Sequence, residues 1–295
     1  MKRIRRITLG ELFEKEFPKH SKKFKKGGIN MLLAVNVGNK VISFAIFSET
    51  GAESVACFKI AADLKKTADE YAVSVRQLLD YSGIDPKDID GAIMASVVPQ
   101  LNEEIKKVIL ALTGKTPVTV GPGVKTGFAI KIDDPAELGA DIVANCAAAV
   151  AAMKAEGIEG PAILLDMDTV TTLFAINKNR EVVGGAIIPG IDMSLGALHR
   201  ETAQLPNIEL LGATRAIGKN TRESLCSGVI LGQAAMIDGL IDRFERELKC
   251  KSEEAILFAT GEKSKPCLAY SSHIFRYDGM MTLKGLLEIY KRTVW

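Results

Sequence analysis

The stretches MLLAVNVGNKVISFAIFSETG (31–51) and ILLDMDTVTTLFAINKNR (163–180) decide the fold. Each stretch has an apolar run, a small polar turn and a second β-rich run, which is the pattern of a β-hairpin. A constant offset of 130 residues relates them and carries Asn36 to Asp166 and Gly38 to Asp168. A hairpin repeated in this way predicts two related domains that face each other.

Helical patterns follow the strands in each half of the chain. They cover 67–82 and 101–113 in the first half, and 221–249 and 282–292 in the second. The alanine-rich run NCAAAVAAM (145–153) is typical of a buried helix. Alternating strands and helices predict α/β layers. We therefore expect an N-terminal domain over 31–152 and a C-terminal domain over 153–295, preceded by a basic extension over 1–30.

The composition excludes several classes of protein. The chain has 295 residues, 47% of them hydrophobic, and a net charge of +2, so no global field favours nucleic acid or membrane as a partner. We find no uninterrupted apolar run of about 18 residues, and so predict no membrane span. Five scattered cysteines include no CxxC pair and no spacing typical of zinc. An odd number of cysteines without a signal peptide indicates reduced thiols in a cytoplasmic protein.

Residues 1–30 differ from the rest, with ten Lys/Arg and three Asp/Glu. A basic tail of this kind can bind nucleic acid or anionic lipid. The alternative is a translated leader, because Lys26-Gly27-Gly28-Ile29-Asn30-Met31 can be encoded by a purine-rich ribosome-binding site before a start codon. We expect the natural protein to begin at Met31, which an intact-mass measurement on protein from the native host would test.

The polar turns of the two hairpins suit phosphate binding. A tight Gly/Asn/Thr turn exposes backbone N–H groups that can hold phosphate oxygens. An aspartate at the end of a strand can hold hydrated Mg²⁺ against a triphosphate. A polar hairpin turn alone is usually only a hairpin, so the repeat is what favours the functional interpretation. The candidate residues are Asn36, Gly38, Asn39 and Lys40 in the first turn, and Asp166, Thr169, Thr171 and Thr172 in the second.

Along nearly all of 31–295 the chain resembles the type III pantothenate kinases. The matching runs include ASVVPQL (95–101), VGPGVKTG (120–127), DDPAELGAD (133–141), GGAIIPGIDMSLGALHRETAQLP (184–206), IGKNTRESLCSGVILGQAAMIDG (217–239) and LFATG (257–261). The resemblance implies two tandem actin-like (ribonuclease H-like) domains with a nucleotide cleft between them. It also implies a homodimer that transfers the γ-phosphoryl group of ATP to pantothenate, the first step towards coenzyme A. Mg²⁺ and a monovalent cation, K⁺ or NH₄⁺, would be its cofactors.

The same resemblance assigns roles to single residues. Asp141 matches the family's catalytic aspartate and would act as the base towards the acceptor hydroxyl, although an aspartate at a helix N-terminus is also favourable without any catalytic role. Thr221 matches a substrate-side threonine, with a helix N-cap as the alternative. The metal candidates are Asn36 and Asp166, and Gly261 belongs to the nucleotide site. The remaining substrate-side candidates are Gly121, Gly123, Lys125, Thr126, Gly127 and Gly139. The alternative for the loop over 121–127 is a simple turn without a role in binding.

The chain departs from the family pattern mainly at the site. Asn36 stands where the family has Asp, Lys40 where it has Thr, Asp168 and Glu262 where it has Gly, Ile132 where it has Tyr, and Ile142 where it has Arg. Asn36 lacks the charge that would hold Mg²⁺, and Ile142 lacks a guanidinium suited to the carboxylate of pantothenate. Losing one such contact typically costs about 10²–10³ in rate. We therefore expect activity that is weak or lost.

Three functions remain open on this basis. They are an active kinase with an adapted site, a non-catalytic paralogue that acts as a ligand sensor or protein-binding regulator, and a kinase for another small acceptor. A thermal shift with ATP·Mg²⁺ separates the second from the others. Lys40 and Asp168 both depart from the family pattern of their turns, and we expect their charged groups to face each other across the cleft.

Overall fold

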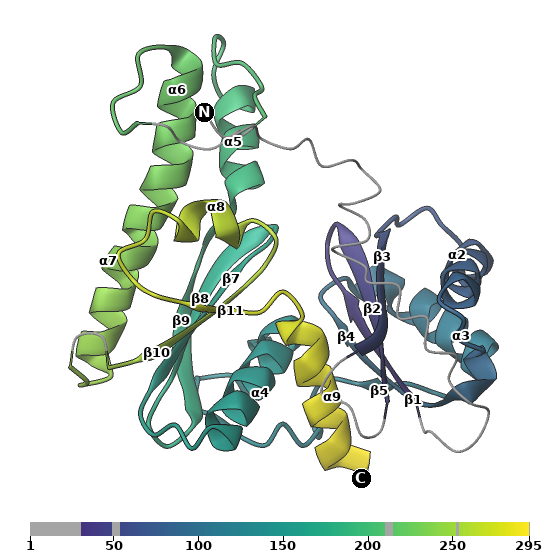
Figure 1. The fold of residues 1–295 in the computed structure, drawn as a ribbon. Helices are drawn as coiled ribbons and strands as arrows, with labels where there is room; N and C mark the ends of the chain where they lie inside the picture. The colour runs from purple at the N-terminus through teal and green to yellow at the C-terminus, as the bar shows by residue number, and fades with distance from the viewer. Residues whose placement is uncertain (1–30, 49–53, 210–214, 252–253, 295) are drawn as a thin grey trace, which may run out of the picture. The chain divides into compact units, whose positions relative to one another are not determined.

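The chain divides into two compact units. The computed structural model describes residues 31–48, 54–209, 215–251 and 254–294 (Figure 1), so the prediction about residues 1–30 lies outside it. The first unit ends at Val120 and the second begins at Gly121. The expected boundary lay after residue 152. The difference arises because helix α4 (Ala140–Ala155) packs on α9 (Met281–Val294) and against strand β7 (Ala162–Met167), which belong to the second unit.

The first unit contains a five-stranded sheet in the order β3-β2-β1-β4-β5. Its strands are β1 (Met31–Val37), β2 (Val41–Ser48), β3 (Ser54–Ala61), β4 (Ile89–Ser96) and β5 (Val118–Thr119). Strands β1 and β2 are antiparallel and place Asn36 opposite Ser43, while β1 and β4 are parallel. The predicted first hairpin is therefore confirmed.

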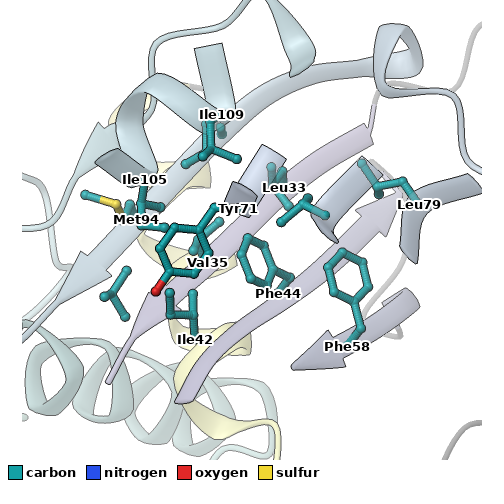
Figure 2. Packing of buried hydrophobic residues seen from close by; sticks show 14 of the residues in the cluster. Leu33, Val35, Ile42, Phe44, Phe58, Tyr71, Leu79, Met94, Ile105 and Ile109 are labelled. Atoms are coloured by element: carbon teal, nitrogen blue, oxygen red, sulfur yellow. The ribbon is translucent and has the colours of Figure 1, made fainter. Parts of the chain in front are cut away.

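Two helices cover this sheet, α2 (Ala68–Tyr81) and α3 (Asn102–Thr113), as the sequence predicted. Helix α2 begins at a capping box: Glu70 Oε2 accepts from the backbone N of Thr67 at 2.8 Å, and Thr67 Oγ1 accepts from the N of Glu70. Figure 2 shows the core between the helices and the sheet. Phe44 and Phe58 stack there with ring centroids 5.1 Å apart, so the first unit has an apolar core of its own.

The second unit contains a six-stranded sheet in the order β11-β10-β7-β8-β9-β6. Its remaining strands are β6 (Ala129–Ile130), β8 (Val170–Ile176), β9 (Glu181–Pro189), β10 (Ile256–Thr260) and β11 (Arg276–Tyr277). Strands β7 and β8 are antiparallel and place Asp166 opposite Thr172. The second hairpin is therefore confirmed at the position that the repeat predicts. Strand β10 runs parallel to β7, with Thr260 beside Asp166.

The helices of the second unit lie on both faces of this sheet. In addition to α4 and α9 they are α5 (Ile191–Arg200), α6 (Thr221–Cys226), α7 (Gly232–Glu247) and α8 (Ser264–Leu268). A π-helical turn, Ser227–Leu231, joins α6 to α7, so the helix predicted over 221–249 is continuous. By length and composition this helix is the candidate membrane span among the described residues, but Ile230, Ile237 and Ile241 are buried in the core of the unit. That burial is the usual behaviour of a core helix.

Helices α4 and α9 approach each other very closely. A Cβ added to Gly285 of α9 would lie 1.8 Å from the backbone O of Ala144 in α4. Only glycine allows this separation. The contact fixes the two helices that reach the end of β7, where the candidate site lies.

Candidate functional site

Asp166 lies at the end of β7 and is held by two helices. Its Oδ2 accepts from Asn145 Nδ2 on α4 at 2.8 Å, and Asn145 Oδ1 accepts from Thr282 Oγ1 on α9 at 2.7 Å. Asp166 Oδ1 is buried and has no hydrogen-bond partner among the described residues. A buried oxygen without a partner is unusual, so this atom is suited to a ligand or a cation.

Three carboxylates of the second unit influence one another at this point. Burial raises the pKa of Asp166 to about 8, with further increases from the charges of Asp168 and Asp141, against a decrease from the Asn145 hydrogen bond. Burial also raises the pKa of Asp141, which the backbone N–H of Ile142 lowers and the Asp168 charge raises. The described residues include no group of three or more His, Cys, Asp or Glu arranged to hold a metal ion. A cation here would therefore need water or ligand oxygens in addition to carboxylate, as Mg²⁺ usually does.

Asp141 is the second residue of α4. Its Oδ1 accepts from the backbone N of Ile142 at 2.8 Å, and Gly139 provides the N-cap position. A Cβ on Gly139 would lie 2.7 Å from that Oδ1. The carboxylate thus has the favourable position at a helix N-terminus, and its raised pKa is compatible with a group that accepts a proton.

Asp168 joins two loops at the carboxyl ends of neighbouring parallel strands. Its Oδ1 accepts from the backbone N of Glu262 at 3.0 Å, and the N of Lys263 donates to the O of Met167 at 3.1 Å. Gly261 has φ +91°, and a Cβ there would lie 2.4 Å from the O of Met167. The loop after β10 is therefore fastened to the turn after β7. The sequence identified Asp168 and Glu262 as separate departures and did not predict that they are bonded to each other.

The threonines of the second hairpin have different surroundings. Thr171 is fully buried beside Met167, and its Oγ1 has no partner among the described residues. Thr172 is half-buried and lies across from Asp166. A Cβ on Gly190 would lie 2.3 Å from the O of Thr169, so the start of α5 touches this turn. Thr172 and Thr169 are thus the accessible members of the set.

The turn of the first hairpin lies in the other unit and is described by itself. Asn36 lies between Ser43 and Ala95, and its Oδ1 is buried without a partner among the described residues. The N of Gly38 donates to the O of Val41 at 3.0 Å, which closes the turn, and Asn39 and Lys40 are exposed. The predicted cleft between the units, and the pairing of Lys40 with Asp168 across it, stay predictions.

The loop after β5 has two glycines with left-handed backbone. Gly123 has φ +91° and Gly127 has φ +85°. Thr126 Oγ1 donates to the O of Phe128 at 2.9 Å, so this hydroxyl supports the local turn, whereas Gly121 and Lys125 are exposed. Ile132 and Ile142, which the sequence analysis identified as departures on the acceptor side, are both half-buried.

Thr221 lies in a groove that the sequence did not predict. It is the first residue of α6, and Asn220 provides the cap by accepting from the N of Glu223 at 2.9 Å, so the N-cap alternative for Thr221 is wrong. The groove has a volume of about 780 Å³ and lies between α5 and the α6–α7 helix. Its lining is largely apolar and includes Leu198 and Met236, which are 37% exposed.

Comparison of the sequence with known proteins gives one consistent result. Residues 32–243 match the family model described as type III pantothenate kinase. A type III pantothenate kinase of Moorella thermoacetica is 41% identical over 262 residues, which cover 89% of this chain and 99% of that protein. One of Halalkalibacterium halodurans is 37% identical over 264 residues, covering 90% of this chain and 100% of that protein.

Comparison with solved structures shows the same fold at low identity. A Campylobacter jejuni protein assigned to the Baf family of transcriptional activators matches with a TM-score of 0.54 and 19% identity, over 88% of this chain and 98% of that one. A Listeria monocytogenes protein assigned as an N-acetylmannosamine kinase matches with a TM-score of 0.50 and 12% identity, over 89% and 99%. The two mixed α/β units are those of the actin-like fold.

Proposed function

Because the chain belongs to the type III pantothenate kinase family, we propose that it transfers the γ-phosphoryl group of ATP to pantothenate at a strongly reduced rate. Phosphoryl transfer depends on positioning ATP·Mg²⁺, holding the acceptor and accepting the proton of its hydroxyl. Asp166, Asp141 and both hairpin turns are present for these tasks. The expected difference from the family pattern is the charge of the residues around them.

The observation that carries this proposal is the environment of Asp168. Its carboxylate takes up the backbone N–H of Glu262, a donor that a phosphate oxygen would otherwise be able to use. It also adds negative charge beside Asp166 and Asp141. A polyanion such as ATP that approaches the end of β7 is therefore repelled by the carboxylates. It also finds the backbone N–H of Glu262 already bonded to Asp168. Both effects weaken nucleotide binding.

Mg²⁺ would change this balance by supplying positive charge between the carboxylates and the phosphates. Asp166, through its buried and unpartnered Oδ1, would hold the cation together with waters, and Asn36 would contribute at most a neutral amide oxygen. The family resemblance adds K⁺ or NH₄⁺ as a second cofactor, which a comparison of activity in K⁺ and Na⁺ buffers would test.

On the acceptor side, Asp141 is the proposed base. Its raised pKa makes it a better proton acceptor than an ordinary carboxylate at neutral pH. Ile142 and Ile132 provide no donor for the carboxylate of pantothenate. We expect the KM for pantothenate to be high for this reason, with each missing contact costing about 10²–10³ in kcat/KM.

A second candidate function is a non-catalytic ligand-binding protein. Asn36 favours it, because an amide with a buried, unpartnered Oδ1 replaces a carboxylate at the end of β1. Such a protein would bind ATP or pantothenate without turnover.

We propose a homodimer for either function. The largely apolar groove between α5 and the α6–α7 helix leaves Leu198 and Met236 exposed, and burial of such side chains against a second copy would stabilise the dimer.

The test compares the unmodified chain with Asp168→Gly and with the triple variant Asn36→Asp, Asp168→Gly and Glu262→Gly. ATP·Mg²⁺ binding is measured by calorimetry and pantothenate phosphorylation by a coupled assay. We expect turnover of the unmodified chain below about 0.1 s⁻¹, against about 10 s⁻¹ for a typical enzyme, and a gain of at least about tenfold in kcat/KM for the triple variant. Asp168→Asn keeps the hydrogen bond without the charge and serves as the matched control. A typical rate from the unmodified chain would refute the reduced activity, and ATP binding without turnover in every variant would favour the second function.

A further inference from the structure

Three cationic side chains lie near the far end of α4 from Asp141, close enough for the charges of Arg292 and Arg180 to act on Lys154. Lys154 is in the last turn of α4, Arg180 is in the turn between β8 and β9, and Arg292 is near the end of α9. Lys154 Nζ donates to the O of Gly127 at 3.3 Å. A Cβ added to Gly127 would lie 2.6 Å from Arg292 Nε. Lys154 and Arg292 therefore lie around the same glycine.

None of the three forms a salt bridge with a carboxylate of the residues that the structure describes. Burial lowers the pKa of Lys154, and the charges of Arg292 and Arg180 lower it further, with no acidic residue acting in the opposite direction. The acidic neighbours along the chain have other partners: Glu156 pairs with Arg276, and Glu181 accepts from Asn177 Nδ2 at 2.8 Å. Neighbouring cations that have no salt-bridge partner repel one another.

Arg180 has two features that its position in a turn does not require. Its φ of +62° is left-handed, where Gly or Asn is the favoured residue and another side chain costs about 1 kcal/mol or more. Its Nη2 donates to the O of Ile158 at 3.3 Å, but Nη1 is buried and has no acceptor among the described residues. A buried guanidinium nitrogen without a partner indicates an acceptor that comes from outside the described chain.

We propose that Lys154, Arg180 and Arg292 form a second anion site, which binds a small phosphate-bearing ligand. Arginine presents paired N–H donors that match phosphate oxygens, and lysine adds a point charge. Asp141 and Lys154 are thirteen residues apart in one helix, which is about 20 Å, so the site is separate from the catalytic aspartate. Cations that cap carbonyl groups at helix C-termini are the simpler explanation. That explanation accounts for Arg180 Nη2, whose acceptor Ile158 follows α4, but not for the buried Nη1, nor for Lys154, whose acceptor Gly127 lies in the loop after β5.

The substitution Arg180→Asn separates these explanations by the direction in which it changes the melting temperature. Asparagine accepts the left-handed backbone and removes one of the three repelling charges. If the cluster is an anion site, the variant without ligand melts about 1–3 °C higher than the unmodified chain and no longer responds to phosphate. If Arg180 is only a cap for Ile158, the variant melts lower. Lys178→Gln is the matched control, because Lys178 is exposed in the same turn.

The experiment measures the melting temperature of the full chain in inorganic phosphate and in glycerol 3-phosphate, against chloride at equal ionic strength. We expect both phosphates to raise it by about 2–4 °C at saturation in the unmodified chain and in Lys178→Gln. A response to only one of them identifies whether the free anion or the monoester is the ligand. The proposal is overturned if phosphate acts no differently from chloride, or if its effect persists in Arg180→Asn, since binding would then be located elsewhere, for instance at the nucleotide loops.

Discussion

Replacement of Asp166 by Asn should stabilise the protein at pH 8 in the absence of metal. The folded protein holds this carboxyl at a pKa of about 8, above its ordinary 3.8. An acid whose pKa is raised by folding contributes stability that is complete below about pH 4 and is lost as the pH rises through about 8. The groups that face it are the carboxylates of Asp141 and Asp168, which repel its charge, and the amide of Asn145, which supports it.

The magnitude follows from that difference in pKa. Each pH unit between 3.8 and about 8 lowers the free energy of unfolding by at most about 1.4 kcal/mol, so the total loss is at most about 6 kcal/mol. The Asp166→Asn variant would escape this loss. The oxygen of the new amide would still accept from Asn145. Its NH₂ group would occupy the position of the buried Oδ1, where it would find no acceptor among the described residues, and an unsatisfied buried donor costs about 1–3 kcal/mol. A net gain of about 2 kcal/mol or more at pH 8 remains, or about 5 °C in Tm.

The assay is urea unfolding of both proteins at pH 5, 6, 7 and 8, with and without Mg²⁺. We expect the stability of the unmodified chain to fall with pH and that of Asp166→Asn to stay nearly level. Mg²⁺ should restore stability at pH 8 only in the unmodified chain, because the ion binds the charged carboxyl. Glu159→Gln, which removes an exposed carboxylate from the same unit, is the control and should follow the unmodified chain. A level profile for the unmodified chain, or an Asp166→Asn variant that is less stable than it at pH 8, would refute the reasoning.

Gly285→Ala should destabilise the protein by about 3 kcal/mol or more, because the new Cβ would lie 1.8 Å from the O of Ala144. Thermal unfolding measures this, and Gly239→Ala, which meets only the flexible end of Arg243, should be tolerated; equal effects in both would contradict the packing argument. Leu198→Glu should convert the proposed dimer into a monomer by placing a charge in the apolar groove. Light scattering on the eluting protein measures the mass, and an unchanged mass would place the interface elsewhere.

The elements of the fold were predictable because their signals are local. The capping residue Thr67 and the apolar spacing of 101–113 lie within a few residues of the helices that they specify. The repeat predicted that Asp166 ends a strand in the same way as Asn36, and the registers of both hairpins confirm it. The domain boundary was not predictable in this way, because α4 belongs to the second unit through contacts with α9, which is far along the chain.

The properties of the site depend on pairs that are distant in sequence. The environment of Asp166 includes Asn145, which is itself held by Thr282, 137 residues further along the chain. Asp168 meets the backbone of Glu262 across 94 residues. A substitution viewed alone indicates only a lost glycine, whereas the bond shows that the two departures lie in one contact. The loop after β10 supplies the backbone donor that the carboxylate at 168 accepts from. It follows that positions 168 and 262, 94 residues apart in the sequence, are direct neighbours and are best tested together.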